Sequence, residues 1–129
     1  MGTFKRFEDI DGWQRARELT KEVYKKSKIG PFARDYGLRD QMRRASVSVM
    51  SNIAEGFERG GTKEFVQFLS IAKGSVGELE AQLYVAHDQG YITEAEFVSL
   101  KDFAKSTKFK IGGLIEYLRQ SGLKGPKYR

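Results

Sequence analysis

Two consecutive stretches of the chain carry apolar residues in alternating steps of three and four, which restricts the fold more than any other feature of the sequence. A seam with this spacing runs along one side of an α-helix, and two such helices pack side by side at a small crossing angle. The two prolines, Pro31 and Pro126, lie outside both stretches, so neither helix is interrupted. The first seam, in residues 62–89, is Phe65, Leu69, Ala72, Val76, Leu79, Leu83 and Ala86; the second, in residues 93–121, is Phe97, Leu100, Ala104, Thr107, Ile111, Leu114 and Leu118.

Two further helical stripes lie upstream and complete a set of four. They predict helices over residues 9–27 and 38–58, joined by a loop from Pro31 to Gly37. Thr93 and Glu96 form a capping box at the start of the last helix. Four helices with short connections predict an all-α, up-down-up-down four-helix bundle. We expect one domain over residues 1–129, with helices at 9–27, 38–58, 62–89 and 93–121 and a mobile tail at 122–129.

The composition argues against most enzymatic and metal chemistry. The chain has no cysteine and a single histidine, His87, which excludes disulfides, thiolate nucleophiles and centres with several histidines. We found no phosphate-binding or nucleophile motif, so we expect a protein that is not an enzyme and that binds no cofactor and no metal. No apolar run approaches the roughly 20 residues of a membrane span. We therefore expect a soluble cytoplasmic protein that does not associate with membranes.

A polar stripe borders the apolar positions of the second predicted helix. Ser48, Asn52, Glu55 and Arg59 follow one another in steps of four, three and four. We expect these side chains to form a partly buried structural network; the alternative is a binding site. Glycines inside the last two helices cost helix stability, so we expect close helix approach there. They are Gly74, Gly77, Gly112 and Gly113.

The chain is basic, with a formal net charge of +6, which is compatible with nucleic acid as a partner. Basic residues recur on single faces of the first and fourth predicted helices, and two arginines open the second. If the first and fourth helices close the bundle, these stripes merge into one field. The predicted nucleic-acid-binding residues are Arg17, Lys21, Lys25, Arg43, Arg44, Lys101, Lys105 and Lys108, with Lys28 on the same face as Lys25. The alternative for each stripe is an ordinary solvated helix face, since Glu18 and Glu22 neighbour the first.

Large apolar residues also lie outside the seams. They are Phe68, Ile71, Val85, Phe103 and Phe109. One four-helix core does not readily hide so many, and exposed apolar patches mark interfaces. We expect a homo-oligomer; the alternative is a wider monomeric core.

Three sequence motifs together resemble a known family. They are S-x-x-S-N-I-A-E-G-x-x-R from Ser48, E-F-x-x-F-L-x-I-A-K-G-S-x-x-E-L-E from Glu64, and G-Y-I from Gly90. Together with Tyr36-Gly37-Leu38 and the Gln41 to Ala45 segment, they resemble the bacterial four-helix bundle proteins encoded in 23S ribosomal RNA intervening sequences. That family includes the accessory variability determinant of diversity-generating retroelements. The resemblance spans about Phe7 to Leu118; Met50 stands where the family usually has proline, so a smaller kink is expected there.

The resemblance implies a ring-like homopentamer, and its retroelement members look like nucleic-acid-binding partners of a reverse transcriptase. It transfers no enzymatic motif. We therefore expect a non-enzymatic oligomeric accessory protein that binds RNA or DNA, linked to rRNA intervening sequences or to a reverse transcriptase. The alternative is a structural or protein-adapter homo-oligomer that binds no nucleic acid.

Overall fold

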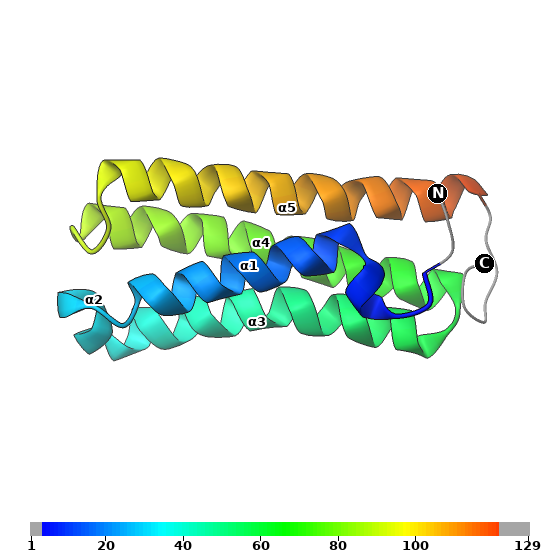
Figure 1. Ribbon diagram of the computed structural model, residues 1–129, viewed down its shortest axis with the longest axis horizontal. Coiled ribbons are helices and arrows are strands. Elements are labelled where there is room, and N and C mark those ends of the chain that lie inside the picture. The colour runs from blue at the N-terminus through cyan, green and yellow to red at the C-terminus, as the bar shows by residue number, and fades with distance from the viewer. Residues whose placement is uncertain (1–3, 122–129) are drawn as a thin grey trace.

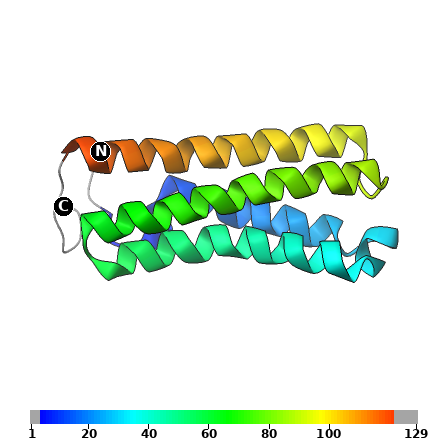
Figure 2. The ribbon, with the colours of Figure 1, turned by 180° about the vertical axis from the view of Figure 1, so that it is seen from behind.

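The computed structural model describes residues 4–121 and consists of four long helices in an antiparallel bundle (Figure 1). Consecutive long helices pack against each other, and the last packs back against the first. From the other side, the view shows α4 between α5 and α3, with α1 behind them (Figure 2). The predicted all-α four-helix bundle is therefore confirmed. The long helices are α1 (Asp11–Lys26), α3 (Tyr36–Arg59), α4 (Thr62–Asp88) and α5 (Glu94–Ser121); the short ones are η1 (Phe7–Asp9) and α2 (Gly30–Arg34).

The predicted seams form the core. All seven predicted positions of α4 are fully buried. In α5 the seam is buried from Leu100 to Leu118, while Phe97 at its start is half-buried. Among the described helices, none is long and apolar enough to cross a membrane.

The segment predicted as a loop between residues 31 and 37 is instead mostly helical. Pro31 sits in the first turn of α2, where its fixed φ favours a helix and its missing N–H costs nothing. Phe32 is buried and anchors this short helix to the core. α3 then begins two residues earlier than predicted, because Asp35 caps it: Oδ1 accepts a hydrogen bond of 3.2 Å from the Leu38 backbone N–H. The predicted tail at 122–129 lies outside the described residues.

α1 is shorter than the predicted 9–27, because Ile10 is extended and separates η1 from it. The capping box predicted at the start of the last helix is confirmed. The Thr93 hydroxyl accepts from the Glu96 backbone N–H at 3.1 Å, and the Glu96 carboxylate accepts from the Thr93 N–H at 2.8 Å. At the end of α3, Gly60 has a φ of +87°, the left-handed conformation that glycine adopts without strain.

Close helix approach occurs at a different glycine from those predicted. A Cβ on Gly56 would lie 2.6 Å from the Phe68 Cβ, so α3 and α4 touch there. At the four glycines predicted to mediate close approach, a Cβ would meet nothing within 4 Å: Gly74, Gly77, Gly112 and Gly113. That prediction is wrong within the single chain, and these glycines instead leave bare backbone on the surface of α4 and α5.

Candidate functional site

The predicted basic residues of α5 face α4 and do not join those of α1. Lys101 and Lys108 reach across to Glu80 on α4, with N–O distances of 3.7 and 2.7 Å. The flank of α5 that faces α1 carries Lys110, whose Nζ lies 3.8 Å from Asp11. The prediction of one field merged across the first and fourth helices is therefore wrong, because successive steps of four and three keep 101, 105 and 108 on a single flank.

On α1 the predicted cations are exposed to solvent. Lys21 pairs with Glu18 at 3.2 Å, and the Arg17 guanidinium lies 5.9 Å from the centre of the Trp13 ring. Lys25 is exposed and makes no ion pair within residues 4–121. This arrangement matches the alternative given above, an ordinary solvated helix face.

The two arginines predicted to open the second helix lie within the first half of α3 and have different surroundings. Arg43 is half-buried: Nε donates to the Ser27 hydroxyl at 2.9 Å, and a terminal nitrogen donates to the Ser27 carbonyl at 3.3 Å. Its guanidinium also lies 4.6 Å from the centre of the Tyr24 ring. Arg43 therefore ties α3 to the C-terminal end of α1. Arg44 is exposed and makes no ion pair or hydrogen bond in the described part of the chain.

A basic groove runs between α4 and α5. Two adjoining hollows, of about 500 and 700 Å³, open along it and share part of their lining. Gly74 and Gly112 form part of their floor, and because glycine has no side chain, the helix backbone is accessible there. The charged residues that line the groove are Lys73, Lys105, Lys108, Glu116 and Arg119.

Charges in and beneath the groove differ in how tightly they are held. Glu80 is only 8% exposed and lies between Lys101 and Lys108, which fixes both ammonium groups. The exposed cations Lys73, Lys105 and Arg119 form no ion pair or hydrogen bond within residues 4–121 and remain available to an anion. Sequence reasoning missed Lys73 and Arg119. For Arg119 a signal existed, since the steps 101, 105, 108, 112, 116 and 119 continue the flank marked by the lysines.

The predicted polar stripe divides into two half-buried residues and two exposed ones. Ser48 shares a hydrogen bond of 2.9 Å with Ser75 of α4, and the Asn52 amide donates to the Ser48 hydroxyl at 3.0 Å and to its carbonyl at 2.8 Å. Glu55 and Arg59 pair at 3.0 Å, but their side chains are 52% and 48% exposed. For these two, partial burial was a wrong prediction, because they lie near the end of α3 where its polar flank turns to solvent.

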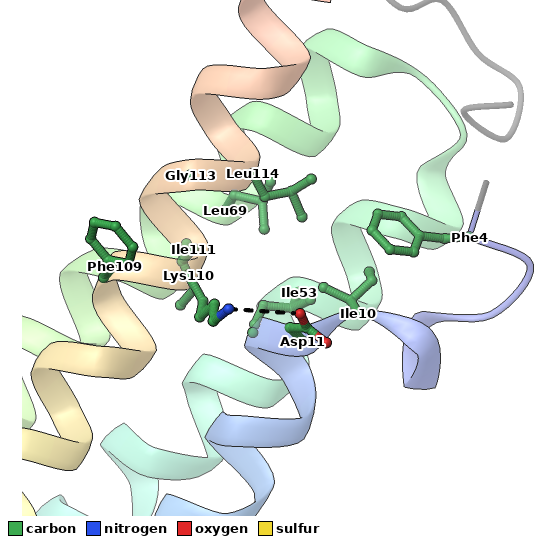
Figure 3. Close-up of a pocket in the computed structure, with 11 residues that line it drawn as sticks. Phe4, Ile10, Asp11, Ile53, Leu69, Phe109, Lys110, Ile111, Gly113 and Leu114 are labelled. Carbon is green, nitrogen blue, oxygen red and sulfur yellow. Dashed lines mark ion pairs between the residues drawn. The ribbon is translucent and has the colours of Figure 1, made fainter. Parts of the chain in front are cut away.

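An apolar pocket of about 380 Å³ lies between the start of α1 and α5 (Figure 3). Phe4 and Ile10 approach it from the N-terminal segment, and Ile111 and Leu114 from α5. The Asp11–Lys110 pair stands at its edge. Phe109, which also lines it, projects from the outer side of α5 and is 78% exposed, the largest exposure among the large apolar residues of 4–121.

The described residues hold no group of three or more acidic, histidine or cysteine side chains that could bind a metal ion. His87 pairs with Glu94 at 2.8 Å and stacks on Phe97, with ring centres 4.6 Å apart. These contacts join the end of α4 to the start of α5, which accounts for this histidine structurally.

Comparison with known proteins agrees with the fold. Residues 8–113 match the family described as 23S rRNA-intervening sequence protein. The crystal structure of a protein of unknown function from the S23 ribosomal protein family of Bacteroides thetaiotaomicron superposes with a TM-score of 0.73 at 20% identity. The match covers 81% of this chain and 97% of that one. No curated protein matches the chain.

Proposed function

Because the chain belongs to the family of 23S rRNA-intervening sequence proteins, we propose that it is a non-enzymatic accessory protein that binds RNA or DNA in the groove between α4 and α5. The observation that carries this proposal is the combination of a hollow, a bare floor at Gly74 and Gly112, and cations along its rim. Such a groove suits a phosphate backbone, since lysine and arginine neutralise its charge and the two glycines leave room for close approach.

The groove supports phosphate binding better than the face of α1. On α1, Lys25 is unpaired in the described part of the chain but lines no hollow, and Lys21 and Lys26 both have acidic neighbours, with Lys26 3.3 Å from Glu96. In the groove, Lys73, Lys105 and Arg119 are unpaired in the described part of the chain. Affinity from such contacts depends weakly on nucleotide sequence and strongly on salt.

The test is RNA binding across a salt series with two matched double variants. Lys105→Gln with Arg119→Gln removes two positive charges from the groove, and Arg15→Gln with Lys25→Gln removes the same charge from α1. A plot of log affinity against log salt concentration has a negative slope. We expect its magnitude to be smaller by roughly 1.5 in the groove variant, because two phosphate contacts are lost. The α1 variant should keep the wild-type slope. The reverse result would move the site to α1, and no binding to RNA or DNA at low salt would refute the function.

Self-association is the second function that a specific observation favours. Phe109 is the most exposed large apolar side chain of residues 4–121 and stands beside an apolar pocket, an arrangement that suits contact between copies of this chain. We propose a homo-oligomer, with a pentamer as the state that the resemblance implies. A reverse transcriptase as further partner rests on that resemblance alone.

Light scattering tests self-association directly. We expect the wild type to have a multiple of the 14.7 kDa chain mass, and Phe109→Ser to shift toward the single-chain mass. Val98→Ser, on the same helix and also exposed, is the control that should not dissociate. A wild-type mass near 14.7 kDa at micromolar concentration would contradict the proposal.

A further inference from the structure

The end of the bundle formed by α2 and the start of α3 carries an exposed aromatic ring that is held in place. Tyr36 is 63% exposed. The guanidinium of Arg39 lies 4.7 Å from the centre of its ring and occupies one face. An exposed tyrosine is ordinarily free to rotate, whereas this one has a cationic group fixed against it.

Arg39 is itself fixed by two further contacts. Its Nε donates to Asp40 at 2.9 Å, and a terminal nitrogen donates to the Ala33 carbonyl at 3.0 Å. The second bond ties the guanidinium to the backbone of α2. The Tyr36 ring therefore rests on a support that is oriented before any ligand arrives.

The corner that carries Tyr36 is anchored to the rest of the fold. Phe32 of α2 is buried and stacks on Tyr91, with ring centres 5.2 Å apart and planes within 18°. Tyr91 in turn donates to Asp35, the residue before Tyr36. The α4–α5 turn and the α2–α3 corner lie at the same end of the bundle (Figure 1).

Two unpaired cations lie at the same end of the bundle, one between α1 and α2 and one in the last turn of α2. Lys28 and Arg34 are exposed and form no ion pair or hydrogen bond within residues 4–121. Ile29, between α1 and α2, is also largely exposed. A preorganised aromatic face with unpaired cations at the same end of the fold is an arrangement on which unpaired nucleic-acid bases stack.

We infer that Tyr36 is a stacking platform for an unpaired base, so that this end of the bundle binds single-stranded segments of RNA or DNA. The inference rests on the proposed nucleic-acid binding and specifies single-stranded segments as part of the ligand. The free face of the ring takes the base, Arg39 holds the opposite face, and Lys28 and Arg34 meet the flanking phosphates.

Three variants of one position separate stacking from simple apolar contact. Tyr36→Phe keeps the flat ring, Tyr36→Leu keeps apolar bulk without it, and Tyr36→Ala removes both. The probes are a short unpaired RNA strand and an RNA duplex of the same length. We expect Tyr36→Leu and Tyr36→Ala to weaken binding of the strand by about tenfold, the loss typical of one stacked base, and to leave the duplex unchanged. Tyr36→Phe should bind both like the wild type.

Several results would overturn the inference while leaving the proposed function in place. They are a wild type that binds only the duplex, equal losses for strand and duplex, and a Tyr36→Leu variant that binds like the wild type. The last result, together with loss in Tyr36→Ala alone, would show that apolar bulk rather than a flat ring contacts the RNA. A wild type that binds neither probe at low salt would refute both proposals. Since the ring is exposed, unchanged circular dichroism melting of all three variants is the folding control.

A spectroscopic readout tests the contact itself. Stacking of a base on Tyr36 shifts its ring protons upfield in the NMR spectrum when the unpaired strand is added, whereas phosphate binding elsewhere leaves them in place. Ring protons that stay unchanged at saturating strand would contradict the platform even if affinity depends on this residue.

Discussion

The phenol of Tyr91 donates a hydrogen bond of 2.8 Å to the Oδ2 atom of Asp35, 56 positions earlier in the chain. The other carboxylate oxygen of Asp35 caps α3 at the Leu38 N–H. The Asp35 side chain therefore both caps α3 and connects it to the turn between α4 and α5. This contact holds the α2–α3 corner in place and, with it, the exposed ring of Tyr36.

Tyr91→Phe removes the hydrogen bond but keeps the stacking on Phe32. We expect a melting temperature a few degrees lower at neutral pH, because Asp35 loses a donor. The hydrogen bond to Asp35 also raises the pKa of Tyr91 above its ordinary value of 10.0. The folded state then holds the phenolic proton more tightly than the unfolded state. The stabilisation is complete below pH 10 and is lost as the pH rises through the raised pKa.

Thermal melts of wild type and Tyr91→Phe at pH 8 and at about pH 11 check both statements. The difference between the two proteins should shrink at the higher pH. A difference that stays constant across this range would show that the phenol–carboxylate bond does not supply the stability.

The two halves of the polar stripe differ in what they contribute to stability. Glu55→Ala breaks an exposed ion pair and should cost about 0.5 kcal/mol or less. Ser48→Ala breaks the half-buried bonds to Ser75 and Asn52 and should cost about 1 kcal/mol more. Both changes to alanine gain a similar small helix propensity. The difference between the two variants in free energy of urea unfolding therefore reports how much the burial of the lost contact matters. Equal costs would mean that the stripe acts as one network.

Sequence patterns predicted the parts of the fold that depend on periodic burial. The seam from Phe65 to Ala86 is fully buried because its spacing alone decides which face of α4 points inward. The pairing of Tyr91 with Asp35 could not be predicted, since it joins residues far apart in the chain whose contact depends on how the helices meet. Lys101 was placed in the wrong field for the same reason: spacing defines a flank of a helix but not the neighbour that the flank faces. Gly74 was predicted to mediate close helix approach, but it leaves exposed backbone instead. A glycine inside a helix is compatible with both, and the sequence does not distinguish them.

Glu80 is a buried carboxylate between two lysines, and its neutralisation has opposite effects on stability and binding. Glu80→Gln should lower the free energy of unfolding by about 1–3 kcal/mol, because Lys101 and Lys108 lose their charged acceptor. The same change frees Lys108 in the groove, so RNA affinity at low salt should rise. Glu78→Gln, exposed on the same helix, is the control and should change stability by about 0.5 kcal/mol or less. Lower stability with weaker binding would contradict a role of the groove in holding phosphate.

Glycine-to-alanine changes should have opposite signs at Gly56 and Gly112. At Gly56 the new Cβ would lie 2.6 Å from the Phe68 Cβ and 3.0 Å from the Phe65 ring. Overpacking of this kind costs about 1–3 kcal/mol, more than the propensity that alanine adds. At Gly112 the Cβ would meet nothing, so Gly112→Ala should stabilise α5 by up to about 1 kcal/mol.

Binding measurements on glycine-to-alanine variants test whether the glycines on the floor of the groove are needed for RNA binding. Gly74→Ala and Gly112→Ala place methyl groups on the floor of the groove and should weaken RNA binding several-fold while raising the melting temperature. Gly77→Ala is the matched control, since it also meets open space on α4 but does not line the groove. It should gain the same stability and bind like the wild type. If all three variants bind alike, the glycines do not admit a phosphate backbone, and the affinity must come from cations that need no close approach.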